Sequence, residues 1–237
     1  MRACPAFSLS LSGAVLLAAC SGDSPAPEPT PTATVAAPRT LVAADFDPWA
    51  LGAKIVGPQG TDPEFDVRAD GEIFATITSY VACPAQMAEC DPEALPEGTK
   101  LTYVYTIVPN GPTSPPAPEP SATDADGAPK EIPPAFFRTT KPVSGFAATL
   151  GYSRDQAAAA LGDEDAITVS VDESQLIWRV TGGSGWKADM PITFWFQTTA
   201  APAGPREAFQ LEWNDRRSAV TAPFPAEEKT VEQGAPR

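Results

Sequence analysis

Thiols and carboxylates are the side chains of this sequence that could do chemistry, because the 237 residues contain no histidine. The commonest general base and the commonest metal ligand are therefore missing. This excludes Ser-His-Asp hydrolysis, Cys-His proteolysis and histidine-ligated zinc catalysis. The four cysteines and 30 acidic residues stand in no complete catalytic, metal or cofactor motif. We therefore predict no catalytic residue, no metal and no cofactor.

Cys20 closes a leader segment. Arg2 precedes an apolar run over residues 7–19 that ends in small residues, which is typical of a signal peptide covering 1–19. The run is too short to span a bilayer. It ends in Leu-Ala-Ala followed by Cys20, which resembles the lipobox of bacterial lipoproteins. An ordinary secretory signal followed by a chance cysteine is the alternative.

The resemblance implies a lipid-anchored protein of the cell envelope. In Gram-negative lipoproteins the chain is cut before the cysteine, and its sulfur and new amino terminus are acylated, here at Cys20. Several acyl chains anchor a protein stably to membrane lipid. Ser21, which is not Asp, implies sorting to the outer membrane. Residues 20–39 are polar and rich in proline, which predicts a flexible tether between lipid and domain.

Cys83 and Cys90 form a pair once the other two cysteines are accounted for. Cys4 leaves with the leader and Cys20 carries lipid, so an even number of thiols remains for an oxidising compartment. We expect a disulfide between Cys83 and Cys90. A redox or metal-binding role is the alternative, but the spacing is neither Cys-x-x-Cys nor a known zinc pattern.

The charge of the chain is strongly acidic. Removing the leader takes away one of the 16 basic residues and no acid, so 15 basic residues face 30 acidic ones, a formal charge of −15. Such a surface repels phosphate backbones, so we expect no nucleic-acid partner.

The rest of the chain is expected to form one domain over residues 40–222. Residues 109–134 are rich in proline and small residues, which predicts a disordered loop. An interdomain linker is the alternative, but it would leave the N-terminal part with too few strands for a core. Residues 223–237 are expected to form a flexible tail.

Short alternating segments predict strands. Asp70-Gly71 joins 65–68 to 73–81 as a hairpin, and 100–108 reads as a central strand. Residues 40–56 read as an irregular segment or an edge strand. A helix is predicted over about 153–162, with Ser153 as its N-cap, Gln156 completing a capping box and Gly162 ending it. Further strands are expected within 135–140, 144–150, 167–171, 175–180 and 191–199, and at 208–213 as the last strand.

Trp195 is the centre of a possible binding platform. On strand 191–199 the alternation places Phe194 and Phe196 on one face, and Trp195 on the other between Thr193 and Gln197. An aromatic ring beside hydrogen-bonding groups suits a glycan or a peptide. Trp186, in a glycine-rich turn, is expected to join it. The alternative is that the helix or the 40–56 segment covers Trp195.

The expected fold is mainly β, an antiparallel immunoglobulin-like β-sandwich with one short α-helix. The expected function is that of a membrane-anchored envelope lipoprotein presenting a non-catalytic interaction domain, with a protein or glycan partner. One alternative is a carbohydrate-active enzyme that uses a carboxylate pair, as glycoside hydrolases do. A purely structural envelope protein is a second alternative.

Overall fold

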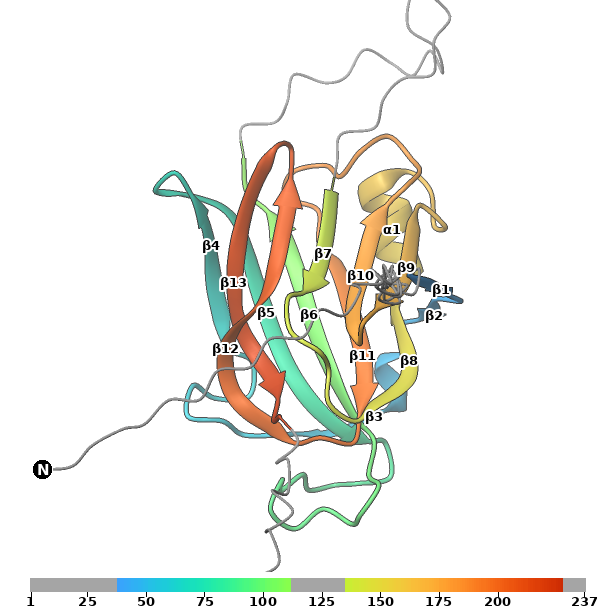
Figure 1. The fold of residues 1–237 in the computed structure, drawn as a ribbon, viewed down its shortest axis with the longest axis vertical. Coiled ribbons are helices and arrows are strands. Elements are labelled where there is room, and N and C mark those ends of the chain that lie inside the picture. Colours follow the sequence, from blue (N-terminus) through green and yellow to red (C-terminus); the bar gives the residue numbers. More distant parts are fainter. Residues whose placement is uncertain (1–37, 112–134, 228–237) are drawn as a thin grey trace, which may run out of the picture. The chain divides into compact units, whose positions relative to one another are not determined.

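The computed structural model describes residues 38–111 and 135–227. These residues form two β-sheets that pack face to face as a sandwich, with one α-helix among them (Figure 1). The predicted fold class, a mainly β sandwich with one short helix, is confirmed. Pairing is antiparallel except between β2 and β8, which run parallel.

The first sheet, here sheet A, has six strands in the order β1-β9-β10-β7-β12-β13. Its strands are β1 (Arg39–Leu41), β7 (Ala135–Thr139), β9 (Ile167–Asp172), β10 (Gln175–Val180), β12 (Pro202–Trp213) and β13 (Arg216–Pro225).

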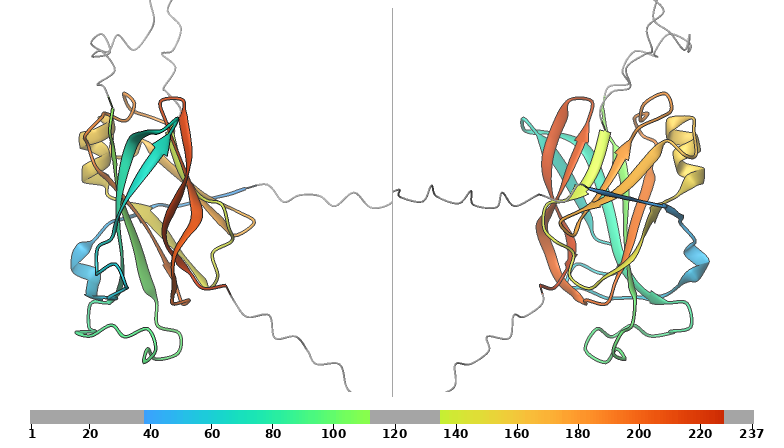
Figure 2. Two further views of the ribbon diagram at one scale, coloured as in Figure 1. Left: turned by 90° about the vertical axis from the view of Figure 1, so that its left-hand side faces the viewer. Right: turned by 45° about the vertical axis from the view of Figure 1, so that its right-hand side comes forward.

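The second sheet, sheet B, follows the order β2-β8-β11-β6-β5-β3, and β4 pairs with β5 beside β3. Its strands are β2 (Ala44–Asp45), β3 (Leu51–Lys54), β4 (Glu64–Ala69), β5 (Glu72–Pro84), β6 (Leu101–Pro109), β8 (Phe146–Tyr152) and β11 (Ile192–Thr198). Figure 2 shows the two layers from further sides.

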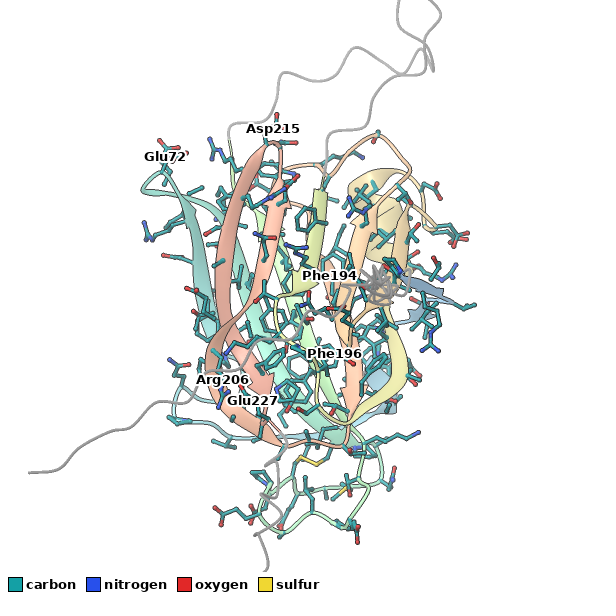
Figure 3. The ribbon with its side chains drawn as sticks, in the orientation of Figure 1. Glu72, Phe194, Phe196, Arg206, Asp215 and Glu227 are labelled. Atoms are coloured by element: carbon teal, nitrogen blue, oxygen red, sulfur yellow. A yellow bond between two sulfur atoms is a disulfide. The ribbon has the colours of Figure 1, made fainter. Side chains whose placement is uncertain are left out.

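Aromatic rings fill the space between the sheets. Phe137 of sheet A stacks on Phe209 with ring centroids 5.2 Å apart, and also packs against Phe194 of sheet B at 5.5 Å. Tyr103 stacks on Phe196 at 5.1 Å. Figure 3 labels Phe194 and Phe196 within this core. Burying such large rings supplies much of the hydrophobic stabilisation of a sandwich.

Two tight hairpins set the register of the outer strands. The predicted Asp70-Gly71 turn joins β4 to β5, and both residues have positive φ, 53° and 85°, as a two-residue turn of this type requires. Asn214 and Asp215, with φ of 49° and 63°, likewise join β12 to β13. The expectation that 208–213 is the last strand is wrong.

Because of strand β13, the ordered domain extends further along the chain than the sequence predicted. It runs to Pro225, beyond the residue 222 expected from the sequence, and Phe224 is only 1% exposed because it packs against Phe209. Proline is tolerated here because β13 is an edge strand, where a missing N–H breaks no sheet bond.

Helix α1 (Arg154–Leu161) confirms the predicted helix and lies at one end of the sandwich (Figure 1). Ser153 caps it through Oγ, which accepts from the Gln156 backbone N–H, and Gly162 ends it with φ of 80°. The expected return bond of a capping box is replaced: Gln156 Oε1 accepts from the backbone N–H of Thr193 at 2.6 Å. The helix is thereby tied to β11.

Residues 39–54 cross from one sheet to the other through short edge strands and the 3-10 turn η1 (Pro48–Ala50), which agrees with the irregular edge segment expected there. Close packing requires glycine where this segment meets β8: a Cβ on Gly151 would lie 1.7 Å from the carbonyl oxygen of Ala44.

Cys83 and Cys90 form the predicted disulfide, which closes a short loop after β5. Cys83 is fully buried. The loop carries Met87, whose carbonyl accepts from the backbone N–H of Ala53 on β3. The disulfide thus also fixes the contact of β3 with its loop.

Several expectations lie outside the described residues: the signal peptide 1–19, acylation of Cys20, the tether up to residue 37, and the segments 112–134 and 228–237. Of the residues that are described, none belongs to a helix with the length and apolar character needed to cross a membrane. The same residues contain no group of acids and cysteines arranged to hold a metal ion.

Candidate functional site

The candidate site lies on the outer face of sheet B around Trp195. The alternation along β11 is as predicted, since Phe194 and Phe196 pack in the core. The side chains of Thr193, Trp195 and Gln197 therefore face outward. The register places Trp195 beside Val104 of β6, and Val104 beside Tyr80 of β5.

Trp195 is buried although it faces outward, being only 7% exposed. The crossing segment 45–51 lies over it, which is the covering that the alternative interpretation anticipated. A small hollow of about 60 Å³ remains between the segment and the sheet. It is lined by Asp45, Phe46, Asp47, Ala50, Leu51, Thr102, Trp195 and Gln197. The open platform expected from the sequence is therefore absent.

The indole N–H of Trp195 has no hydrogen-bond partner among the described residues, although it is buried. A buried donor left unpaired costs about 1–3 kcal/mol. The hollow beside Trp195 is large enough for a water molecule or a small polar group of a ligand. An acceptor that reached this N–H would remove the cost of leaving it unpaired.

Trp49 projects from the segment that covers the hollow and is 90% exposed. It sits in η1, where Asp47 Oδ1 accepts from the Trp49 backbone N–H at 2.9 Å and Pro48 begins the turn. The turn fixes the backbone of Trp49 while leaving its ring in solvent. A large aromatic ring held in this way is a typical anchor for a binding partner.

The polar neighbours of Trp195 are engaged within the sheet. Thr193 is 3% exposed, and its hydroxyl bonds that of Thr106 at 2.9 Å. Gln197 Nε2 donates to Thr102 Oγ1 at 3.3 Å. Of the two, Gln197 lines the hollow and Thr193 does not.

Trp186 does not join the site, which corrects the predicted platform. It is 5% exposed, packs edge-on against Phe194 at 5.8 Å and donates from Nε1 to the carbonyl of Met190. Phe194 points into the core, so Trp186 and Trp195 lie on opposite faces of sheet B. The glycine-rich turn directs Trp186 inward, where burial of its ring against Phe194 and the bond to Met190 hold it.

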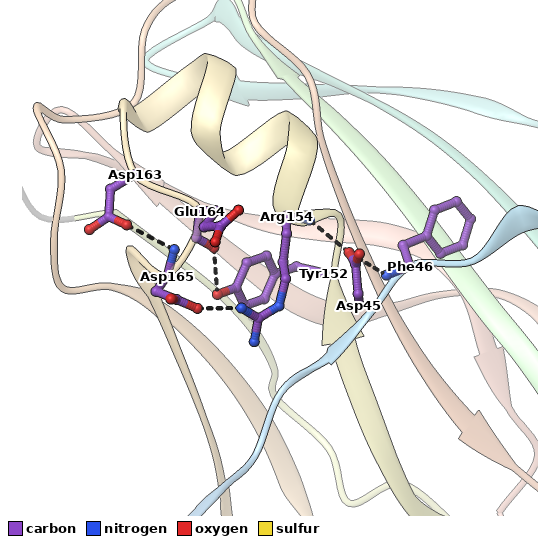
Figure 4. Close-up of polar contacts among 7 residues, drawn as sticks. All are labelled: Asp45, Phe46, Tyr152, Arg154, Asp163, Glu164 and Asp165. Carbon is purple, nitrogen blue, oxygen red and sulfur yellow. Dashed lines mark hydrogen bonds and ion pairs between the residues drawn. The ribbon is translucent and has the colours of Figure 1, made fainter.

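Asp45 and Asp47 bring two carboxylates to the hollow. Asp45 Oδ1 accepts from the backbone N–H groups of Phe46 at 2.8 Å and of Arg154 at 2.9 Å, which ties the segment to the start of α1 (Figure 4). Asp47 caps η1 as described above. Both carboxylates therefore hold the covering segment in place.

A larger groove of about 210 Å³ lies elsewhere, between the 55–63 loop and the beginning of β12. Its lining is mostly apolar and includes Pro58, Pro63, Pro92, Pro202, Pro205 and Pro223. At its edge Lys54 forms an ion pair with Asp62 and lies over the ring of Tyr80.

The ionisation of this edge follows from its contacts. Burial raises the pKa of Asp62, but hydrogen bonds from Lys54 and Thr61 and the charge of Lys54 outweigh it, so the pKa is lowered overall. Burial and the nearby charge of Asp62 raise the pKa of Tyr80. Each shift favours the ordinary charge state at neutral pH.

No protein-family model, curated protein sequence or solved structure matches this chain. The site therefore has to be interpreted from its own geometry. The sequence analysis missed Trp49, whose exposure depends on the cap formed by Asp47. An Asp-Pro-Trp sequence was the available signal, since Asp before Pro favours a capped turn.

Proposed function

We propose that this chain is a lipid-anchored protein of the cell envelope, most consistent with the outer membrane, whose β-sandwich binds a protein or glycan partner without catalysis. The anchor is supported by the resemblance of residues 17–20 to a lipobox and by the proline-rich sequence that follows. The disulfide between Cys83 and Cys90 fits an oxidising compartment.

One observation carries the binding part of the proposal: exposed Trp49 belongs to the segment 45–51 that covers a hollow lined by Trp195, and the buried N–H of Trp195 lacks a partner among the described residues. A partner that packs on the ring of Trp49 and brings an acceptor to the N–H of Trp195 would gain apolar contact and satisfy the donor. An exposed tryptophan contributes little to folding, so it gives a protein with only a structural role no advantage.

The anchor is tested by metabolic labelling with an alkyne fatty acid. Full-length protein should incorporate the label, and Cys20→Ala should not. Cys4→Ala is the matched control, since it removes a leader cysteine and should leave labelling unchanged. A Cys20→Ala protein that is still labelled would refute the anchor.

The binding site is tested by placing a photo-crosslinking amino acid at position 49 in intact cells. Position 42 is the matched control, because Val42 is 93% exposed on the same crossing segment but lies outside residues 45–51, which cover the hollow. We expect a discrete crosslinked product from position 49 that Trp195→Phe weakens. Equal products from both positions would contradict a specific site.

The carboxylate enzyme remains the second candidate, because Asp45 and Asp47 both line the hollow. It predicts release of reducing ends from peptidoglycan or an envelope polysaccharide, and loss of that release in Asp47→Asn. Reducing ends released by the wild-type protein but not by this variant would replace the binding proposal with the enzyme.

A further inference from the structure

Three arginines surround one aromatic ring on the outer face of sheet A. The guanidinium carbons of Arg138, Arg179 and Arg217 lie 5.5, 5.6 and 5.4 Å from the ring centroid of Phe136. They come from three different strands, β7, β10 and β13. We refer to these three side chains as the arginine cluster.

The sheet register brings the cluster together. Arg179 is paired with Phe136, Phe136 with Glu212, and Glu212 with Arg217, so one row of side chains crosses four strands. Thr168 extends the row onto β9. Arg138 belongs to the next row on the same face, beside Gln210. The cluster is therefore a property of the assembled sheet.

Within the described part of the chain, neighbouring acidic side chains on sheet A neutralise only one of the three arginines in the cluster. Glu212, 8% exposed, binds Arg217 in an ion pair. Arg138 donates from Nε to the neutral amide oxygen of Gln210 at 2.9 Å. Arg179 is exposed and has no ion pair with any residue that the structure describes. Two guanidinium charges thus remain uncompensated in a chain with 30 acidic and 16 basic residues.

A purely structural role explains only part of this arrangement. The guanidinium groups shield Phe136, which is 8% exposed, and cation–π contacts of this kind stabilise a fold modestly. Shielding one ring does not need three like charges gathered around it, because like charges repel one another. Arginine also presents a planar fork of donors that matches carboxylate and phosphate oxygens.

We propose that the arginine cluster binds an anionic glycan, through sugar carboxylate or phosphate groups placed between Arg138 and Arg179. The inference goes beyond the proposed function, because the cluster lies on the outer face of sheet A, whereas the Trp195 site lies on the outer face of sheet B. Thr168 and Ser170, which share this face, offer hydroxyl groups that can accept from the sugar hydroxyl groups. The donors and acceptors that a charged sugar needs are thus present together.

A glycan fits this face better than a peptide or a membrane. Arg138 and Arg179, between which the anion would lie, stand on the inner strands β7 and β10, whose backbone groups are paired on both sides, so no edge is offered there for adding a peptide strand. A planar anionic membrane would face the acidic surface of the whole molecule, whereas a single polymer chain meets only the cluster. Charges beyond about 8 Å are largely screened at physiological salt.

The test is calorimetric titration of the full chain, purified in detergent, with oligogalacturonate as a carboxylated glycan. Its methyl ester is the neutral counterpart. We expect binding to the carboxylated form that weakens as salt increases, and none to the ester. Arg179→Gln and Arg138→Gln should each lower the affinity by about tenfold, equivalent to about 1.4 kcal/mol.

Arg68→Gln is the matched control. It removes one exposed arginine, paired with Asp66 on β4 of the other sheet, and should leave the affinity unchanged. Equal losses in Arg68→Gln and Arg179→Gln would overturn the inference, and so would equal binding of the ester. Anionic lipid vesicles that bind while oligogalacturonate does not would also overturn it. The titration measures glycan binding only. A negative result would therefore overturn the glycan inference and would not affect the proposed lipid anchor at Cys20, which fatty-acid labelling tests separately.

Discussion

Trp178 Nε1 donates a buried hydrogen bond to the backbone carbonyl of Gly151, 2.9 Å away on the opposite sheet. Trp178 lies on β10 of sheet A and Gly151 on β8 of sheet B. Two sheets of a sandwich are usually joined by side-chain packing alone. Here a directional bond fixes how one sheet sits on the other, and it does so on β8, the strand that pairs with β2 of the crossing segment.

Replacing Trp178 with Phe should therefore lower the free energy of unfolding by about 2 kcal/mol, from the lost bond and the unfilled volume. Urea denaturation followed by circular dichroism measures it. Trp49→Phe is the matched control and should change stability by less than about 0.5 kcal/mol, because Trp49 is exposed. Equal effects of the two changes would contradict the bridging role.

Gly151→Ala should destabilise the protein by about 1–3 kcal/mol, because the added Cβ collides with the Ala44 carbonyl and separates β2 from β8. Gly57→Ala is the control, since its nearest neighbour would be 3.7 Å away. Hydrogen exchange at β2 and β8 should increase in the first variant alone. A fully stable Gly151→Ala protein would mean that the crossing segment is displaced without cost.

Removing the disulfide by Cys83→Ala with Cys90→Ala should lower the free energy of unfolding by about 2.5 kcal/mol, the chain-entropy value for so short a loop. A reductant should lower the melting temperature of the wild-type protein and leave that of the double variant unchanged. A reductant effect of similar size in both proteins would show that it acts elsewhere.

Alkaline pH should unfold the protein through its buried tyrosines. Burial raises the pKa of Tyr105 well above 10, with a contribution from Tyr103, and its hydroxyl donates to the Pro223 carbonyl at 2.6 Å. The unfolded chain loses this proton near pH 10 while the folded protein keeps it. The contribution of Tyr105 to the free energy of unfolding is therefore fully present below about pH 10, and it is lost as the pH rises further.

Tyr105→Phe tests this prediction. It should cost about 1 kcal/mol at neutral pH, through the lost hydrogen bond, and should flatten the fall in stability above about pH 10. Denaturation curves across this pH range provide the measurement. An unchanged slope in the variant would assign the alkaline unfolding to other groups.

Local signals predicted the elements whose conformation is decided within a few residues. The Asp70-Gly71 hairpin and the helix between Ser153 and Gly162 formed as expected, since their turn and cap residues act on their own neighbours. Strand β13 was missed because Pro223 and Pro225 resemble a tail. Its buried positions become recognisable only once β12 has provided the pairing partner.

The candidate site was harder to predict because it depends on which segments meet. The face of Trp195 followed from alternation, but its cover did not, since nothing local places residues 45–51 over β11. Trp186 was assigned to the wrong face because a turn gives no alternation to read. The arginine cluster joins residues 79 positions apart, from Arg138 to Arg217, and was invisible before the register was known.

The short edge strands have a consequence for colloidal behaviour. Sheet A begins with the three residues of β1, sheet B begins with the two residues of β2, and the far edge of sheet A carries Pro223 and Pro225. β4, which borders sheet B, carries Glu64, Asp66 and Arg68. Edges of this kind offer few positions for another chain to pair, so they oppose sheet-to-sheet polymerisation. At the high protein concentrations of a crowded compartment, the molecules should stay separate.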